Sequence, residues 1–536
     1  MEMFVKLFGR TRELRGGKWG LAFLLLFSLA IKVTVLFSGD IINRDGVRYI
    51  DAARQFAQGN FLEGLRIDWM PFYSLLIAGF HFLIRDWVLA GQLISLFSLV
   101  FGLIPLYLLT RDLFDEKVAF WAGLAFALAP MLNNHSVDLL RDPVFLFFVA
   151  WSVYFCLRAL RTEALLYFTL ASLSATFALF CRLEGILLWG VFLPVLAVLA
   201  IKNREDRPLL LKGMSVLVSL PLVLGLLLGG GLYLVARPDL APSVGSEEIT
   251  GQLKEVISGN SFAYYHRKVS KGVFENYHSR YEKLKDLERT MPGWSHHGNL
   301  LETTRHYLPV VYLLSAIEAL ARNLFPPFVL ALLAGFRKLP NLRRGHWSLL
   351  LLTIVYFLLA YYIIFTRDWI SKRYILVPAL LFYPWVGRGL ERIWVGIAEC
   401  RWPRIAMVLF LIVFCAAPAY KSLEDFTGPG KGNAIRMAGQ WLSLQPEFQN
   451  AFIACSDPRV RLYSSEKMEF LKKMESYSVS RDFKKMESVA FQGRADLLVI
   501  EISKKQRRKI TEFSHFSLIK EFEGHSNDVL IYSRKG

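Results

Sequence analysis

A carboxylate directly behind the first apolar segment is the strongest candidate for catalysis. The run Leu21–Phe37 is followed by SGDIINRDGVRYID, which contains Asp45. Placing ionisable residues near lipid at the end of a hydrophobic helix costs free energy. Such residues therefore often belong to a functional site. A helix start favours the charged carboxylate and nearby lipid disfavours it. This balance predicts that Asp45 can take a proton from a hydroxyl group, although an ordinary helix-start acid is the alternative.

A second acid stands before a later apolar segment. Asp142 lies in LRDP, directly ahead of Pro143, where a helix-start residue is the simple interpretation. On the same side of a membrane as Asp45, it could act in catalysis by orienting a substrate hydroxyl, or the two acids could share a divalent metal ion. No other metal site and no disulfide framework is indicated, because the five cysteines are scattered without CxxC spacing.

Basic residues beside other apolar segments are candidates for binding a phosphate group. Arg367, Lys372 and Arg373 crowd a short loop ahead of a late apolar segment, where an anionic lipid phosphate would explain them. Arg182 and Glu184 share a tight turn. At this spacing they do not face each other along a helix, so we expect separate partners, with a substrate phosphate for Arg182. Binding to lipid headgroups is the alternative in both places.

Neighbours of these candidates are expected to line the substrate site. They are Arg44, Tyr49, Trp69, Glu184 and Tyr374. Asp68-Trp69-Met70-Pro71 is expected to shape the entry to a short apolar helix, and anchoring at the membrane interface is an alternative role for Trp69.

The composition indicates that a membrane holds the elements carrying these residues. The chain has 536 residues, of which 54% are hydrophobic, and its mean hydropathy is +0.36. Several apolar runs approach the roughly 20 residues that span a bilayer. We expect eleven crossings: Leu21–Phe37, Val88–Thr110, Val118–Asn133, Pro143–Leu160, Ala164–Phe180, Gly185–Ile201, Gly213–Val235, Ala321–Phe336, Trp347–Thr366, Tyr374–Gly387 and Ile405–Tyr420. Pro71–Ile84 covers only about 21 Å of a roughly 30 Å core, so we interpret it as a helix that dips into the outer leaflet.

Basic residues between the spans predict the orientation of the chain. The net charge of +18 lies in short clusters between apolar runs, a pattern that orients membrane proteins, so nucleic acid is not an expected partner. With residues 1–20 in the cytoplasm, five successive clusters fall inside: Arg111/Lys117, Arg158/Arg161, Lys202/Arg204/Arg207/Lys212, Arg337/Lys338/Arg343/Arg344 and Arg388/Arg392/Arg401/Arg404. The loops 38–87, 134–142, 236–320 and 367–373 then lie outside, and Asp45, Asp142 and Arg373 share one face.

Two further parts of the outer side have recognisable patterns. Val47, Ile50, Ala53 and Phe56 recur at three- to four-residue spacing, which predicts an amphipathic surface helix over residues 45–58. Residues 421–536 have the composition of a water-soluble α/β domain. Its expected elements are a helix near Ala434–Leu442 and strands at Ala451–Cys455, Asp496–Ile502, Phe516–Phe522 and Asp528–Ser533.

Taken together, these motifs resemble the GT-C superfamily of glycosyltransferases that use polyprenyl-phosphate sugars, family 39 in the broad sense, which includes protein mannosyltransferases and the aminoarabinose lipid A transferase. The matching pieces are Arg44-Asp45-Gly46 through Gly59-Asn60, Met70-Pro71-Phe72-Tyr73, Arg141-Asp142-Pro143, Arg182-Leu183-Glu184-Gly185 and Lys372-Arg373-Tyr374. The resemblance covers about residues 20–420. The chain departs from it at Met70-Pro71, where many members have two prolines, and at Gly46, where many have Glu.

The resemblance implies an α-helical, polytopic GT-C protein of a bacterial inner membrane, with a catalytic domain over residues 21–420 and its C-terminus outside the cytoplasm. Asp45 would deprotonate a hydroxyl of a lipid, glycan or protein acceptor, which attacks the anomeric carbon of a polyprenyl-phosphate sugar with inversion. Arg373, Lys372 and Arg182 would stabilise the leaving phosphate. An O-antigen ligase or polymerase is one alternative. A lipid or sugar transporter is another, although transporters tend to show repeated halves and mid-membrane charges.

Overall fold

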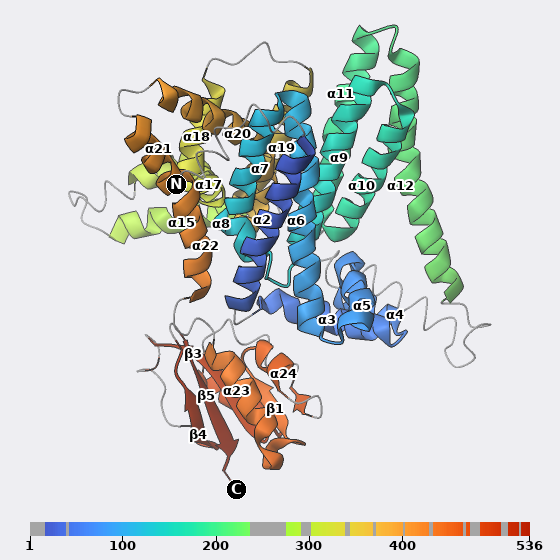
Figure 1. Cartoon of the computed structure of the whole chain (residues 1–536). Helices are drawn as coiled ribbons and strands as arrows, with labels where there is room; N and C mark the ends of the chain where they lie inside the picture. Colours follow the sequence, from blue (N-terminus) through green and yellow to red (C-terminus); the bar gives the residue numbers. More distant parts are fainter. Residues whose placement is uncertain are drawn as a thin grey trace.

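The chain forms a bundle of helices with a small sheet domain at one end (Figure 1). A computed structural model describes residues 17–38, 42–235, 275–290, 302–337, 344–367, 371–399, 403–427, 433–464, 468–471, 483–504, 507, 513–524 and 527–535. Parts of the expected N-terminal segment and of the loops 236–320 and 367–373 lie outside these residues.

Seven helices of the described chain are long and apolar enough to cross a membrane. They are α2 (Gly17–Ser38), α6 (Trp87–Leu113), α9 (Asp142–Thr162), α11 (Leu187–Lys202) with the preceding 3-10 turn η2 (Leu183–Ile186), α12 (Arg207–Val235), α19 (Arg344–Arg367), and the continuous run of α21 (Pro403–Leu411), η5 (Ile412–Ala416) and α22 (Ala417–Thr427). These match seven of the expected spans, and a multi-span membrane protein is confirmed.

Other expected spans have a different form. The segment expected at Val118–Asn133 is split into α7 (Glu116–Leu128) and α8 (Pro130–His135), because a proline follows Ala129. Helix α10 (Leu165–Cys181) has 17 residues and is shorter than a typical span. The late segment begins with the 3-10 turn η4 (Lys372–Ile375) and continues as α20 (Leu376–Ala398), well beyond the expected end at Gly387. The expected count of eleven crossings is therefore not confirmed.

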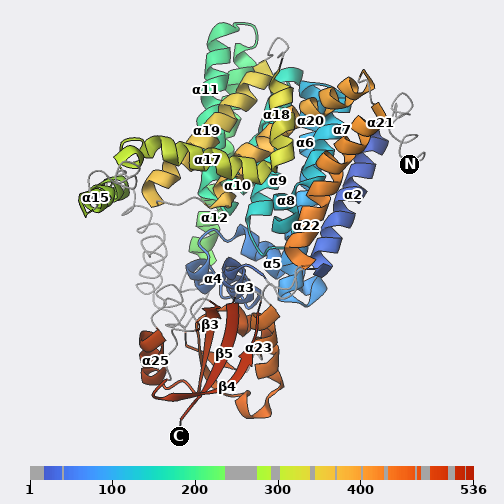
Figure 2. The ribbon, with the colours of Figure 1, turned by 90° about the vertical axis from the view of Figure 1, so that its left-hand side faces the viewer.

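The span expected at Ala321–Phe336 is not one continuous helix. Helices α17 (Leu308–Leu324) and α18 (Pro326–Phe336) meet at an angle of 101°. Phe325 between them has a φ of 73° and precedes a proline, so the chain turns sharply there. Residues 308–320 are also helical rather than loop, as is α15 (Glu275–Thr290). Figure 2 shows α17 lying across the bundle while α18 runs along it.

Three short helices lie together at the end of the bundle nearest the sheet domain: α3 (Arg44–Ala57), α4 (Phe61–Ile67) and α5 (Phe72–Ile84) (Figure 1). The predicted amphipathic helix is confirmed, since Val47, Ile50, Ala53 and Phe56 are all buried. Its start is fixed by the side chain of Asn43, which accepts a hydrogen bond of 3.1 Å from the Asp45 amide. Its end is followed by Gly59 with a φ of 83°. Helix α5 has 13 residues, too few to span a bilayer.

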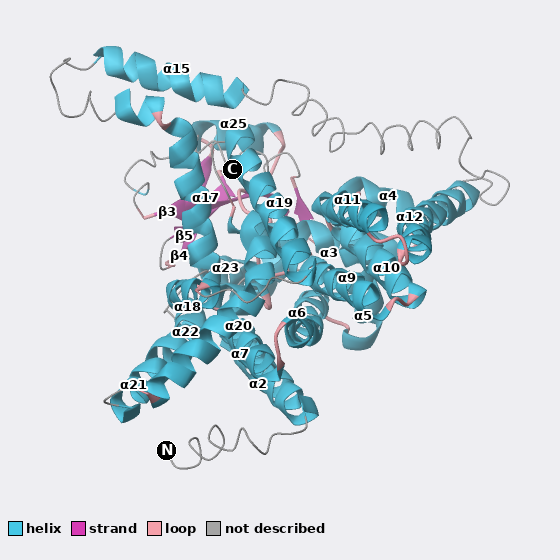
Figure 3. Ribbon diagram, turned by 90° about the horizontal axis from the view of Figure 1, so that it is seen from above, coloured by secondary structure: helices cyan, strands magenta, loops and turns pink. Residues whose placement is uncertain are grey.

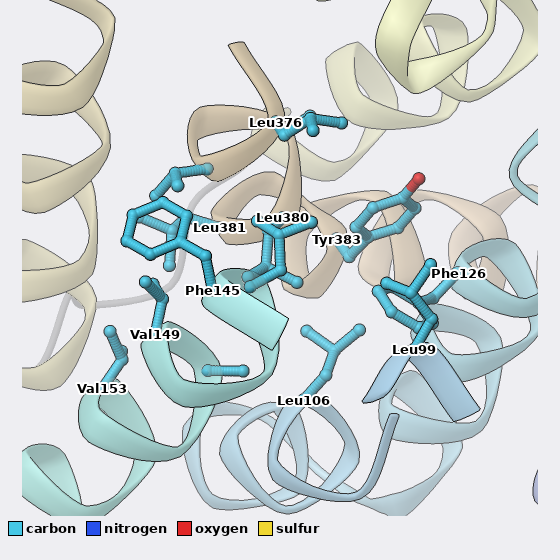
Figure 4. Packing of buried hydrophobic residues seen from close by; sticks show 14 of the residues in the cluster. Leu99, Leu106, Phe126, Phe145, Val149, Val153, Leu376, Leu380, Leu381 and Tyr383 are labelled. Atoms are coloured by element: carbon cyan, nitrogen blue, oxygen red, sulfur yellow. The ribbon is translucent and has the colours of Figure 1, made fainter. Parts of the chain in front are cut away.

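The core of the bundle is formed by α6, α7, α9 and α20. Leu99 and Leu106 of α6 pack with Phe145 and Val149 of α9 and with the residues of α20 shown in Figure 4. Seen along the bundle in Figure 3, α2, α6, α7 and α20 lie close together, with α12 and α21 at the periphery. Glycine allows α18 and α20 to approach each other closely, since a Cβ on Gly389 of α20 would lie 1.7 Å from the Ala331 oxygen of α18. This packing holds the start of α9 and the start of α20 side by side.

The C-terminal domain is a five-stranded sheet with helices on both faces. The strand order is β2-β1-β3-β5-β4, parallel between β2, β1 and β3 and antiparallel elsewhere. The strands are β1 (Phe452–Cys455), β2 (Glu469–Phe470), β3 (Leu497–Ser503), β4 (Phe516–Phe522) and β5 (Asn527–Arg534). Helices α23 (Asn433–Leu444) and α24 (Arg459–Tyr463) pack on one face and α25 (Phe483–Gln492) on the other. All four expected strands and the expected helix are confirmed, whereas β2, α24 and α25 were not foreseen.

Candidate active site

One arginine joins the two acids singled out in the sequence. The guanidinium of Arg373, at the start of the late helix, donates from Nη1 to Asp45 Oδ2 at 2.6 Å. Its Nε donates to Asp142 Oδ2 at 2.9 Å, and its Nη2 lies 2.7 Å from the same oxygen. Residues 328 positions apart in the chain thus meet at one point, as the expectation of a common face requires.

A second arginine holds the other oxygen of Asp142. Arg182 donates from Nη1 to Asp142 Oδ1. It also donates from Nη2 to Glu184 Oε1 at 2.7 Å and from Nε to Glu184 Oε2 at 3.3 Å. The expectation that Arg182 and Glu184 have separate partners is therefore wrong. Arg182 has an extended backbone and Glu184 lies in the 3-10 turn η2, so the helical geometry behind that expectation does not apply.

Aromatic rings and a backbone contact fix this pair from the sides. The Arg182 guanidinium lies 5.3 Å from the centre of the Tyr374 ring and 5.8 Å from that of Phe145, close enough for cation–π attraction. Tyr356 of α19 donates a hydrogen bond of 2.9 Å to the Glu184 carbonyl. Glu184 and Tyr374, both expected to line the substrate, therefore contact Arg182 directly and hold it in place.

The two acids differ in their exposure. The Asp142 side chain is 1% exposed, whereas the Asp45 side chain is 46% exposed. Burial opposes the charge of Arg373, but the neighbouring Asp142 carboxylate raises the pKa of Arg373 well above its ordinary value. Asp142 is thus a fixed anion between two guanidinium groups, and Asp45 is the carboxylate that solvent reaches.

A further group of polar residues borders the site, and its two arginines were not predicted as site residues from the sequence. The guanidinium groups of Arg48 and Arg141 lie 5.4 Å and 5.9 Å from the ring centre of the buried Tyr49. Arg141 Nη1 is 3.8 Å from Oδ1 of the fully buried Asp68, and neither atom has a hydrogen-bond partner within the described part of the chain. Burial raises the pKa of Asp68 and of Tyr49. Two positions in the sequence could have indicated the arginines, since Arg48 stands one helical turn after Asp45 and Arg141 precedes Asp142.

The remaining candidates lie around this centre. Lys372 is exposed beside Arg373, and its carbonyl accepts a 3.1 Å hydrogen bond from Asn323. Trp69 is half-buried in the turn between α4 and α5. Arg44 extends to the C-terminal domain, where it contacts Asp457 and Glu501.

The arrangement does not fit a divalent metal ion shared by the two acids. Both oxygens of Asp142 and one oxygen of Asp45 are bound by guanidinium groups. Among the described residues, no group of three or more His, Cys, Asp or Glu side chains is arranged so that it could hold a metal ion. A cation such as Mg²⁺ requires several free oxygen ligands, so it would first have to displace Arg373.

Comparisons with known proteins address the fold of the chain. Residues 68–235 match the family model for dolichyl-phosphate-mannose-protein mannosyltransferase. A sequence search of curated proteins finds no match. Among solved structures, ArnT from Cupriavidus metallidurans bound to undecaprenyl phosphate aligns with a TM-score of 0.52 and 14% identity, over 96% of this chain and 98% of that one.

A second solved structure has a similar fold. The archaeal oligosaccharyltransferase AglB from Archaeoglobus fulgidus, in complex with an inhibitory peptide and a dolichol-phosphate, aligns with a TM-score of 0.55 and 12% identity. The alignment covers 91% of this chain and 70% of AglB. The chain therefore has the fold shared by ArnT and AglB, and together with the match to the mannosyltransferase model this confirms the resemblance to GT-C glycosyltransferases.

Proposed function

We propose that this protein is a membrane glycosyltransferase that moves a sugar from a polyprenyl phosphate to a hydroxyl group, with Asp45 as the general base. The observation that carries the proposal is the shared guanidinium of Arg373, which contacts an exposed carboxylate and a buried one at the same time. Such a site offers a proton acceptor and a fixed positive charge within one hydrogen bond of each other.

The hydrogen bonds of Asp45 indicate which atom takes the proton. Arg373 binds Oδ2, so Oδ1 is the oxygen that an acceptor hydroxyl can approach. The hydroxyl proton passes to Oδ1 while the hydroxyl oxygen forms a bond to the anomeric carbon. The bond from that carbon to the phosphate oxygen breaks, and the electron pair leaves with the polyprenyl phosphate. Attack opposite the leaving group inverts the anomeric centre.

The charge changes in this step explain the role of the cations. Asp45 loses one negative charge when it is protonated, and the leaving phosphate gains one. Arg373 already lies beside Asp45, and Lys372 and Arg48 are exposed nearby, so these three cations can stabilise the phosphate. Arg182 is bound to Asp142 and Glu184 and 8% exposed. We therefore assign it to holding Asp142 rather than to binding the phosphate, the role expected from its sequence.

Two solved structures of similar fold support the proposed class of carrier. ArnT was solved with undecaprenyl phosphate and AglB with dolichol-phosphate, which supports a polyprenyl phosphate as the carrier. The acceptor would be a hydroxyl of a lipid, a glycan or a protein. The basic ends of α6, α9 and α12 lie away from Asp45, so the positive-inside rule favours a site on the outer face of the inner membrane.

A donor panel tests the proposal. Purified protein is incubated with several polyprenyl-phospho-sugars and candidate acceptors, and release of polyprenyl phosphate is measured. Asp45→Asn should lower turnover by about 10²- to 10⁴-fold, the usual contribution of a general base. Glu63→Gln is the matched control, because Glu63 is 47% exposed and paired with Arg66, much as Asp45 is 46% exposed and paired with Arg373.

The outcomes separate the alternatives. Turnover by Asp45→Asn equal to that of the wild type would remove Asp45 as the base. Release from diphosphate-linked glycans alone would favour a ligase or polymerase. Absence of turnover with every donor, together with uptake of a labelled lipid or sugar into proteoliposomes, would favour a transporter.

A further inference from the structure

The C-terminal domain meets the catalytic end of the bundle through two clusters of charged residues. Arg44, the first residue of α3, donates from Nε to Asp457 Oδ2 at 2.7 Å and from Nη2 to Glu501 Oε2 at 2.8 Å. Asp51, about two turns along the same helix, is bound by Arg461 of α24. Figure 2 shows the sheet directly beneath α3 and α4. Helix α3 is therefore held at two points along its length.

The first cluster lies at a special position of the sheet. Asp457 follows the carboxyl end of β1, and Glu501 lies near the carboxyl end of the neighbouring parallel strand β3. After β1 the chain passes to α24 on one face, and after β3 it passes to Phe513, which packs with α25 on the other face. In open α/β sheets, ligands bind in the crevice formed at such a switch point. Here the side chain of Arg44 binds the two carboxylates at this point of the sheet.

The carboxylates that receive Arg44 are themselves held firmly. Asp457 is 1% exposed and Glu501 is 12% exposed. Arg459 binds Asp457 through its backbone amide at 2.9 Å, Nε at 2.9 Å and Nη2 at 2.8 Å. Glu501 accepts a 2.8 Å hydrogen bond from Asn527. An isolated surface ion pair contributes little to stability, but a fixed network with two-point guanidinium binding constrains geometry.

Arg44 also stands directly before the proposed base. A displacement of the Arg44 backbone moves Asp45 with it, because both lie in the first turn of α3, and the Asn43 side chain binds the Asp45 amide at 3.1 Å. Asp45 must meet Arg373 from another helix at 2.6 Å. A misplacement of about 1 Å at a catalytic group can reduce the rate by about a hundredfold, so the position of α3 matters for turnover.

We propose that the C-terminal domain positions the catalytic base: Asp457 and Glu501, at the switch point of the sheet, hold Arg44 and thereby set Asp45 against Arg373. This inference rests on the proposed function of Asp45. It assigns the switch point of the sheet to a contact within the chain rather than to binding the acceptor, and it makes Arg44, Asp457 and Glu501 positioning residues.

The test compares two arginines of similar surroundings in the full-length protein. Arg44 is 42% exposed and bound to two carboxylates. Arg507 is 45% exposed and is also bound to two carboxylates, Glu521 and Asp528 of the sheet. We expect Arg44→Gln and Glu501→Gln each to lower kcat by about ten- to a hundredfold, with the KM for the donor within about twofold of the wild type. Arg507→Gln should leave both unchanged. The double variant Arg44→Gln/Glu501→Gln should be no slower than the slower single variant, because both remove the same interaction.

Hydrogen exchange supplies a readout that does not depend on turnover. Without substrate, peptides covering residues 43–50 should exchange faster in Arg44→Gln and Glu501→Gln than in the wild type or Arg507→Gln. A wild-type kcat in Arg44→Gln, equal losses in Arg507→Gln, or unchanged exchange at residues 43–50 would overturn the inference. Failure of the wild type to use any donor would overturn the proposed function instead, while the exchange data would still decide whether the domain holds α3.

Discussion

The two ends of α9 carry the same residue types in opposite proportions. At its start, Asp142 lies with Asp45 and Glu184 around two guanidinium groups, those of Arg182 and Arg373. Near its end, Asp112 of α6 is the acid that faces three arginines: Arg158 at 2.9 Å, Arg161 at 3.6 Å and Arg111 at 3.9 Å. The ion pairs at the start of α9 thus join three acids to two arginines, whereas those near its end join one acid to three arginines.

The exposure of the arginines differs as well. Arg182 and Arg373 are 8% and 21% exposed, whereas Arg111 and Arg161 are 42% and 53% exposed. Arg158 and Arg161 border a cavity of about 270 Å³ whose lining also includes four leucines and a third arginine, Arg344. Near the end of α9, which we call the far end, the arginines matter through their positive charge, because the number of basic residues on one side orients a membrane protein. At the start of α9 the geometry of each contact matters, because buried charges must be paired.

Replacing Asp142 at one end of α9 and Asp112 at the other should give the largest difference in turnover and stability between the two ends. Asp142→Asn leaves Arg182 and Arg373 without their common anion, so we expect turnover to fall by about a thousandfold and the free energy of unfolding to fall by about 3 kcal/mol. Asp112→Asn should cost about 1 kcal/mol and leave turnover nearly unchanged. Donor turnover and thermal unfolding of both variants in detergent measure the effects. Equal losses in the two variants would show that the ends do not differ in this way.

Replacing an arginine by lysine at each end should give the next largest effect. A lysine at position 373 keeps the charge but cannot reach Asp45 and Asp142 together as the planar guanidinium does. We expect Arg373→Lys to lower kcat by about a hundredfold. Arg158→Lys should change it by less than about threefold, since there only the charge is needed. Steady-state kinetics at saturating donor distinguish the two. A fully active Arg373→Lys would mean that the bridging contact is not required.

Much of the architecture could be predicted from the sequence because it depends on local patterns. The three- to four-residue spacing of Val47, Ile50 and Ala53 identified α3, and short continuous apolar runs identified β3 and β5. The bend between α17 and α18 also had a local signal, the Pro326-Pro327 pair after Phe325. It was missed because apolar composition was given more weight than the prolines.

The contacts of the site depend on distant residues and could be predicted only in part. The basic clusters between successive spans placed Asp45, Asp142 and Arg373 on one face of the membrane. No local pattern, however, shows that one guanidinium binds both acids. The pairing of Arg182 with Glu184 was predicted wrongly because the turn is not a regular helix. The contact of Arg44 with Asp457 joins two domains, and the sequence contains no periodicity that indicates it.

Neutralising Glu184, the second acid that Arg182 binds, should lower turnover by less than the two preceding changes. Glu184→Gln keeps an acceptor for Arg182 but removes a charge, so Arg182 should still bind Asp142. We expect kcat to fall by about tenfold, the range of one charge-assisted hydrogen bond. Glu116→Gln is the control at the far end, where Glu116 accepts a 3.3 Å hydrogen bond from Tyr107, and it should stay within about twofold of wild-type turnover. A thousandfold loss in Glu184→Gln would indicate that Glu184 itself contacts the substrate.

Removal of divalent metal should change the turnover of the wild type least of all. Turnover should respond to added metal only after Arg373 is replaced. Because guanidinium groups bind both oxygens of Asp142 and one oxygen of Asp45, chelation with EDTA should change turnover by less than about twofold. In Arg373→Gln the two carboxylates lose their shared cation and repel each other, so added Mg²⁺ should raise the residual turnover of that variant by more than about threefold. Loss of wild-type activity in EDTA that Mg²⁺ restores would contradict this account, because a metal ion would then occupy the position between the acids that Arg373 holds here.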